Sequence, residues 1–102
     1  MITVSFPKDV SRNFRLVVKG HSSEEKGKDI ICSSVSSLVQ TYLRGIEKHL
    51  GAKFTGNFQP GICDLEIEVS CEMLAKFTIV SEIFRDGFLE IAKAYPKQVK
   101  LI

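Results

Sequence analysis

Apolar and polar side chains alternate along two segments near the N-terminus of this sequence. Every second residue is hydrophobic from Ile2 to Phe6 and again from Phe14 to Val18. This period of two is typical of β-strands that bury one face. The connector between the segments contains Pro7, Lys8 and Asp9, residues that favour a turn or loop. We therefore expect a β-hairpin at the start of the chain.

The next hydrophobic segment follows a different period. Apolar residues recur at three- and four-residue steps from Ile31 to Leu50, which predicts an amphipathic helix. Asp29 stands just before this run and is a favoured N-cap residue, and Gly51 follows the run as a helix stop. The positions expected to face the core are Ile31, Val35, Leu38, Val39, Tyr42, Leu43, Ile46 and Leu50.

The second half of the chain repeats the order of strands and helix. We expect strands over Lys53 to Phe58 and Ile62 to Cys71, joined by the turn Gln59-Pro60-Gly61. A second helix is expected from about Glu72 to Ala94, followed by a last strand. Its apolar stripe comprises Leu74, Phe77, Val80, Phe84, Phe88, Ile91 and Tyr95, and Met73, Ile79 and Ile83 widen the stripe as a dimer contact would.

The predicted order ββαββαβ indicates an α+β domain, with two helices packed on a mainly antiparallel sheet of about five strands. The strand order does not follow from the pattern. The length of 102 residues, 44% of them hydrophobic and 25% charged, suits one soluble domain over residues 1–102. A net charge of +2 neither requires nor excludes nucleic acid. No run is long enough to cross a membrane and no secretory signal opens the chain, so we expect a cytosolic protein.

Reactive side chains gather at the start of the first helix. Asp29, Cys32 and Ser36 lie three and four residues apart, so they can form one row beside the apolar stripe. Unpaired backbone N–H groups and the helix dipole in a first turn favour a thiolate at Cys32. His21, on the preceding polar loop, can accept the thiol proton and return it to a leaving amine. This pattern indicates a thiol nucleophile with its base.

The two remaining cysteines lie in the strand expected over Ile62 to Cys71. Cys63 and Cys71 share its apolar face, so we interpret both as core or near-core residues. Eight strand residues separate their Cα atoms by roughly 26 Å, which is too far for a disulfide. The two histidines, His21 and His49, are remote in sequence and no cysteines have zinc-ligand spacing, so no metal site is expected.

At these residues the chain resembles a known family, the ribosomal-processing cysteine proteases called Prp. The family pattern is a Gly-His pair, a short loop, and then Gly-x-Asp-Ile-Val-Cys-Ala-Ala-Val-Ser. This sequence has Gly20-His21 and then Gly27-Lys28-Asp29-Ile30-Ile31-Cys32-Ser33-Ser34-Val35-Ser36. The similarity covers almost the whole chain, including a last helix that runs into Tyr95-Pro96. The departures are small residues at Ser22, Ser33 and Ser34 in place of alanine, and charges at Glu24, Glu25 and Lys26 where relatives often have an aromatic residue.

The resemblance implies a catalytic dyad of His21 and Cys32, supported by Gly20, Asp29 and Ser36, with no metal or organic cofactor. It implies a cysteine endopeptidase that removes a short N-terminal extension from a large-subunit ribosomal protein. The implied substrate is therefore an extended, partly apolar peptide. The resemblance also implies a homodimer in the bacterial cytoplasm. We expect no membrane partner and no direct binding of nucleic acid.

Several details of such a site stay open. Asp29 can cap the helix or hold His21 in the useful tautomer, and Ser36 can hydrogen-bond the thiolate or a helix carbonyl. Oxyanion donors are expected among the backbone N–H groups near Cys32. The substrate is expected across the mouth formed by the second strand, the polar loop and the start of the first helix, where it can add to a free sheet edge.

Two functions of other classes compete with the protease. A ribosome- or RNA-binding module would contact phosphates through basic side chains, although acidic residues interrupt them and no stacking aromatic run accompanies them. A redox-sensing thiol protein would use oxidation of Cys32, although no partner cysteine lies nearby in the sequence. The basic residues concerned are Lys8, Arg12, Arg15, Lys19, Lys26 and Lys28.

Overall fold

The computed structural model describes residues 1–20, 28–59 and 61–102. Within these ranges the predicted order ββαββαβ is confirmed, with one short 3-10 helix added before the second long helix. The elements are β1 (Ile2–Ser5), β2 (Asn13–Lys19), α1 (Lys28–Leu50), β3 (Lys53–Gln59), β4 (Ile62–Glu68), η1 (Cys71–Met73), α2 (Leu74–Ala94) and β5 (Val99–Leu101).

The strands form one mixed sheet in the order β3-β4-β2-β1-β5. Three neighbouring pairs are antiparallel, β1 with β2, β2 with β4, and β3 with β4, whereas β5 runs parallel to β1. The expected N-terminal hairpin and the mainly antiparallel sheet are therefore confirmed. Since β2 is paired on both sides, the edges of the described sheet belong to β3 and β5.

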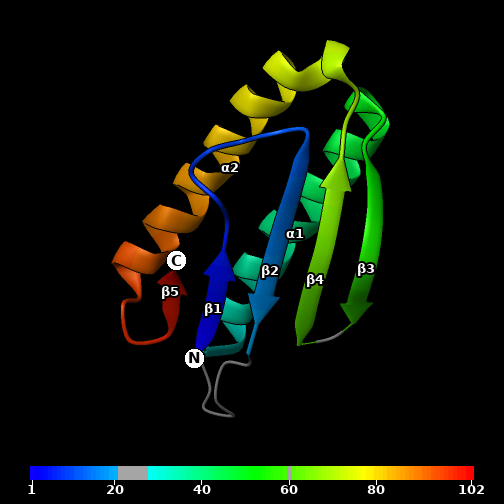
Figure 1. The fold of residues 1–102 in the computed structure, drawn as a ribbon. Helices are drawn as coiled ribbons and strands as arrows, with labels where there is room; N and C mark the ends of the chain where they lie inside the picture. The colour runs from blue at the N-terminus through cyan, green and yellow to red at the C-terminus, as the bar shows by residue number, and fades with distance from the viewer. Residues whose placement is uncertain (21–27, 60) are drawn as a thin grey trace.

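Both long helices lie on the same face of the sheet, α2 toward β1 and β5, and α1 beside it (Figure 1). The core between these layers is aromatic at its centre, where the ring of Phe6 contacts Phe14, Tyr42 and Phe88. The Tyr42 hydroxyl shares a buried hydrogen bond of 2.7 Å with Ser81 of α2. Burial raises the pKa of Tyr42 well above its ordinary value, so this phenol stays neutral and links the helices.

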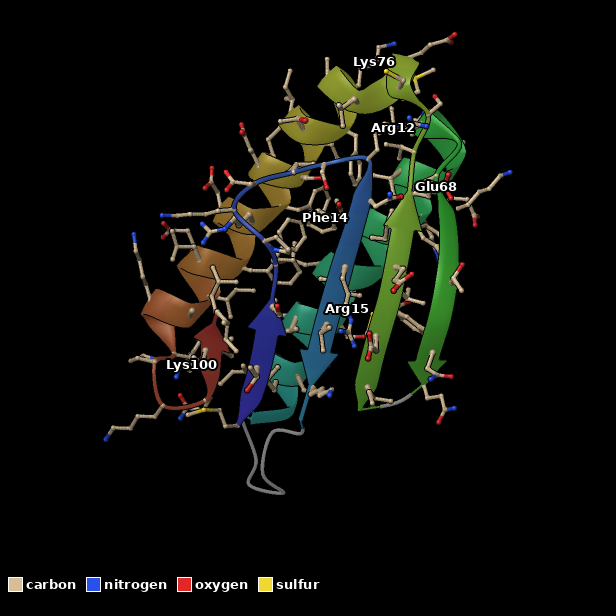
Figure 2. The ribbon with its side chains drawn as sticks, viewed as in Figure 1. Arg12, Phe14, Arg15, Glu68, Lys76 and Lys100 are labelled. Atoms are coloured by element: carbon tan, nitrogen blue, oxygen red, sulfur yellow. The ribbon has the colours of Figure 1, made fainter. Side chains whose placement is uncertain are left out.

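The opposite face of the sheet carries polar side chains. Figure 2 shows Arg15 on β2, beside β4, where it forms a bidentate pair with Asp64 at 2.9 and 2.8 Å. The hydrogen bonds from Arg15 hold the pKa of the Asp64 carboxyl below its ordinary value. This alternation of buried and solvent-facing residues is the one that the sequence pattern predicts.

The expectation that Cys71 is a core residue is wrong. Strand β4 ends at Glu68, and the chain enters η1 at Cys71, so the period of two no longer sets which way the side chains point. Cys71 is exposed, whereas Cys63 is buried as expected. Tyr95 is also exposed, because α2 ends one residue before it. Ile79 and Ile83 lie on α2 with exposed fractions of 60% and 61%.

Candidate active site

Helix α1 begins at Lys28, one residue before the predicted N-cap. Asp29 is thus the second helical residue, and Cys32 is the fifth, at the end of the first turn and the start of the second. In regular α-helical pairing, the N–H of a fifth residue bonds the carbonyl four positions earlier. The N–H of Cys32 is therefore used by the helix, which leaves it a poor candidate for the oxyanion donor.

The Cys32 side chain is half-buried at a groove with a volume of about 650 Å³. One wall of the groove is α1, and the other is the turn end of the β3–β4 hairpin. The residues that line it are Ile2, Val18, Gly20, Cys32, Ser33, Val35, Ser36, Ser37, Val39, Gln40, Phe58, Gln59, Gly61, Ile62 and Cys63. Cys32 and Ser36 therefore share one cavity, as their spacing predicts.

The polar wall of this groove contains a hydrogen bond that the sequence did not indicate. Gln40 Nε2 donates to Ser36 Oγ at 2.9 Å, so the Ser36 oxygen accepts a hydrogen bond from the next turn of α1. Ser34, two residues earlier, does bond a helix carbonyl, donating to Ile30 O at 2.8 Å. The Ser36 hydroxyl hydrogen remains available to a group in the groove.

Gly20 directly follows β2 and has a conformation that other residues rarely adopt, with φ of 109°. Its N–H donates to the carbonyl of Gly61 at 3.2 Å, and a Cβ at this position would overlap the carbonyl oxygen of Met1. This close approach of backbones explains why glycine is required. The residue after Gly20 is His21, which lies outside the described residues, so the predicted distance to Cys32 stays untested.

The other cysteines have environments unlike that of Cys32. Cys63 is only 5% exposed at the floor of the groove, and burial, with the Asp64 carboxylate second, raises its pKa to about 11. Cys71 is exposed on η1 and does not line the groove. A thiol that is both accessible and inside the groove is therefore found only at Cys32, among the three cysteines described.

Other kinds of site find less support in the described part of the chain. It contains no cluster of three His, Cys, Asp or Glu residues that could hold a metal ion. The described helices include none that is long and apolar enough to span a membrane. Among the basic residues considered for phosphate contacts, Arg15 is paired with Asp64 and Arg12 donates to Val69 O at 3.3 Å.

Gln40 and Phe58 are among the groove residues that the sequence pattern does not identify as part of the site. Gln40 continues the row of Asp29, Cys32 and Ser36 by four more residues, a signal that the sequence did contain. Phe58 lies in β3, far from α1 in the sequence, and only the fold brings it opposite this helix.

Comparisons with known proteins agree with this geometry. A family model described as cysteine protease Prp matches residues 1–100. Among solved structures, the essential ribosomal processing protease Prp from S. aureus, in complex with a covalently linked product peptide, is similar with a TM-score of 0.76 and 16% identity, covering 99% of this chain and 97% of that one. The same protease with a substrate peptide gives a TM-score of 0.73 and 13% identity, covering 99% and 95%.

A third solved structure, SMU.848 from Streptococcus mutans, has a TM-score of 0.72 and 22% identity, covering 98% of this chain and 89% of that one. No curated protein matches the sequence significantly. At these identities the structural similarity supports the fold, while the family model covers nearly the whole chain.

Proposed function

The chain belongs to the cysteine protease Prp family, and we propose that it removes an N-terminal extension from a large-subunit ribosomal protein, using Cys32 as nucleophile and His21 as general base and acid. Residues 1–102 would form a single protease domain. The observation that carries the assignment of the nucleophile is the position of Cys32 at the groove, since Cys63 is buried with a raised pKa and Cys71 lies elsewhere.

The proposed reaction has two steps. The Cys32 thiol gives its proton to His21, and the sulfur attacks the peptide carbonyl carbon to form a tetrahedral oxyanion. Collapse of this intermediate breaks the C–N bond as His21 returns the proton to the leaving amine, and a thioester remains on Cys32. Water, activated by His21, then hydrolyses the thioester and restores the thiol. No metal or organic cofactor takes part in either step.

The supporting residues have separate proposed roles. Gly20 allows the close backbone approach at the end of β2 that leads into His21. Asp29 lies in the first turn of α1, where the helix dipole favours a carboxylate. Its proposed role is either to stabilise this end of the helix or to orient His21. Ser36 offers a hydroxyl at the groove, held from the other side by Gln40.

The substrate assignment draws on two observations. The groove combines an apolar floor with a polar wall, which suits an extended, partly apolar peptide. The similar S. aureus protein is a ribosomal processing protease whose structures contain a substrate peptide and a product peptide. We propose that the protein acts in the cytoplasm, because ribosomal proteins are made there, and the proposed reaction does not require direct binding of nucleic acid.

We further propose that the protein is a homodimer that uses the outer side of α2. Ile79 and Ile83 lie one helical turn apart with more than half of each side chain exposed. A second copy of the same surface would cover these side chains by two-fold symmetry. Sedimentation of the wild-type protein and of an Ile79→Glu, Ile83→Glu double variant tests this proposal, which predicts a dimer for the first and a monomer for the second.

Cleavage of the matching ribosomal protein tests the main proposal. Purified protein is incubated with the N-terminal segment of that protein from the same organism, and the products are identified by mass spectrometry. A single cut that is lost in Cys32→Ala and in His21→Ala is expected. Cys71→Ala is the matched control, because this exposed thiol lies outside the groove, and it should cleave like the wild type. Cleavage that survives Cys32→Ala would exclude Cys32 as the nucleophile.

A further inference from the structure

The groove beside Cys32 has an aromatic side chain, Phe58, on the wall opposite α1, and this ring makes no ring contact with another described residue. Phe58 is 50% exposed, although it lies in register with Cys63, which is 5% exposed. Register partners on neighbouring strands point to the same face of a sheet, so Phe58 projects toward the layer of helices. In Figure 1 the first turns of α1 lie behind β1 and β2, away from the turn end of the β3–β4 hairpin, and the groove that Phe58 lines lies between α1 and this hairpin.

A peptide side chain in this groove would cover the exposed ring. The floor beside Phe58 contains Val18, Val39 and the buried thiol of Cys63, so an entering side chain would meet apolar surface below and aromatic surface at its side. When the entering side chain is apolar, its own surface and the groove surface leave water together, which favours binding. When the entering side chain is charged, it loses its hydration in the groove, which disfavours binding. Because Cys32 also lines the groove, the peptide that occupies the groove is the peptide that is cut.

We propose that Phe58 is a specificity-determining residue that selects a large apolar side chain of the substrate, and that Gln40 holds the backbone of the same peptide further along α1. This inference rests on the proposed function, because it takes the groove to be the place where the substrate of Cys32 binds. It goes beyond that function by assigning selection and positioning to two residues outside the dyad and its supporting residues.

The position of Gln40 defines how far the bound peptide extends. Gln40 follows Cys32 by eight residues, which is about 12 Å along the helix axis at about 1.5 Å per residue. An extended peptide covers this distance with about four residues. A primary amide has two N–H donors and one oxygen acceptor, and Ser36 accepts from one donor. The second N–H and the oxygen can therefore pair with a peptide group about four residues from the scissile bond.

The test of Phe58 compares peptides that differ only by Leu or Ala at single positions near the scissile bond. We expect one position at which the wild type prefers Leu by about tenfold or more in kcat/KM, and expect Phe58→Ala to remove most of this preference. The Ala peptide should be cleaved by both proteins within about twofold. Asn57→Ala is the matched control, since this neighbour in β3 is exposed and does not line the groove. A Phe58→Ala protein that keeps the wild-type preference at every position would overturn the inference.

The test of Gln40 uses peptides of graded length on the side of the scissile bond where the Phe58 effect is found. Gln40→Leu keeps the size of the side chain and removes its hydrogen bonds. We expect kcat/KM to fall about fivefold, through KM, for peptides that reach about four residues from the cut, with no change for shorter ones. Thr41→Val, an exposed neighbour that does not line the groove, should leave all lengths unchanged. An equal effect of Gln40→Leu on every length, or no effect, contradicts the assignment.

Failure of the proposed function gives a different result from failure of this inference. If the wild type cleaves none of the peptides and the Cys32→Ala protein binds none of them in calorimetry, both proposals fall. If cleavage depends on Cys32 and His21 while selectivity is independent of Phe58, the proposed function stands and the inference falls. Circular dichroism and urea unfolding of each variant show that a loss is not caused by unfolding.

Discussion

Replacing Gly20 by alanine perturbs the end of β2 at the position that precedes His21. The substitution has two separate costs. The φ of 109° lies where a side chain is strained, which costs roughly 1–2 kcal/mol. The added Cβ would also overlap the carbonyl oxygen of Met1, so the backbone of one strand must shift, at a cost of about 1–2 kcal/mol more. We expect a total loss of about 2–4 kcal/mol in the free energy of unfolding.

A second glycine separates these two costs. Gly51, after α1, has φ of 65°, but a Cβ there would meet nothing within 4 Å. Gly51→Ala should therefore show only the conformational cost of about 1 kcal/mol. In urea unfolding, the midpoint of Gly20→Ala should lie about 1–2 M below that of Gly51→Ala. Since Gly51 does not line the groove, only Gly20→Ala should also lower kcat/KM under conditions where both variants are folded. Equal midpoints and wild-type activity for Gly20→Ala would refute the argument from backbone approach.

Three further predictions concern the core and the start of α1. Tyr42→Phe leaves the buried Ser81 hydroxyl without its partner and should cost about 1–3 kcal/mol in urea unfolding, whereas Phe in place of the exposed Tyr95 should cost nothing measurable. Because the Cys63 thiol has an ordinary pKa of 9.0 and a folded pKa of about 11, the unfolded chain releases this proton first as the pH rises. The stability of the wild type relative to Cys63→Ala should therefore fall between pH 9.0 and about 11 by an amount on the order of 2 kcal/mol, and a difference independent of pH would exclude a buried, neutral thiol. Asp29→Asn should lower stability by less than about 1 kcal/mol with activity retained if Asp29 serves the helix end, and should greatly lower kcat with the fold intact if it orients His21.

The elements of the fold follow from local periods, but their arrangement does not. The spacing from Ile31 to Leu50 predicts α1, and the alternation around Leu16 and Leu65 predicts β2 and β4. The pairing of β2 with β4 brings together residues such as Leu16 and Leu65, which are far apart in sequence, and no local pattern encodes that contact. The parallel pairing of β5 with β1 is non-local in the same way. The alternation predicts the burial of Cys71 wrongly because β4 ends at Glu68, three residues before it.

The residues of the site likewise separate into those that a local pattern predicts and those that only the fold brings together. Cys32 and Ser36 belong to one helix, so their common orientation follows from a spacing of four residues. Phe58 reaches the same groove only because β3 pairs with β4 and the hairpin turn brings it opposite α1. His21 lies outside the described residues, so its place in the dyad depends on the family pattern and on the cleavage test.

The position of the groove follows from how α1 uses its apolar stripe. Ile31, Val35 and Val39 are buried, which holds the first turns of the helix against the sheet. A straight helix that crosses a twisted sheet cannot cover every strand along its whole length. The groove lies between α1 and the turn end of β3 and β4. The exposed surface of Phe58 contributes nothing to folding, because it is in water in the unfolded chain as well, and it contributes roughly 25 cal/mol per Å² to binding when a peptide covers it. Filling this gap from α1 by Ser36→Leu should therefore stabilise the fold slightly while raising KM, and a variant that is more stable with unchanged KM would show that substrate does not enter the groove.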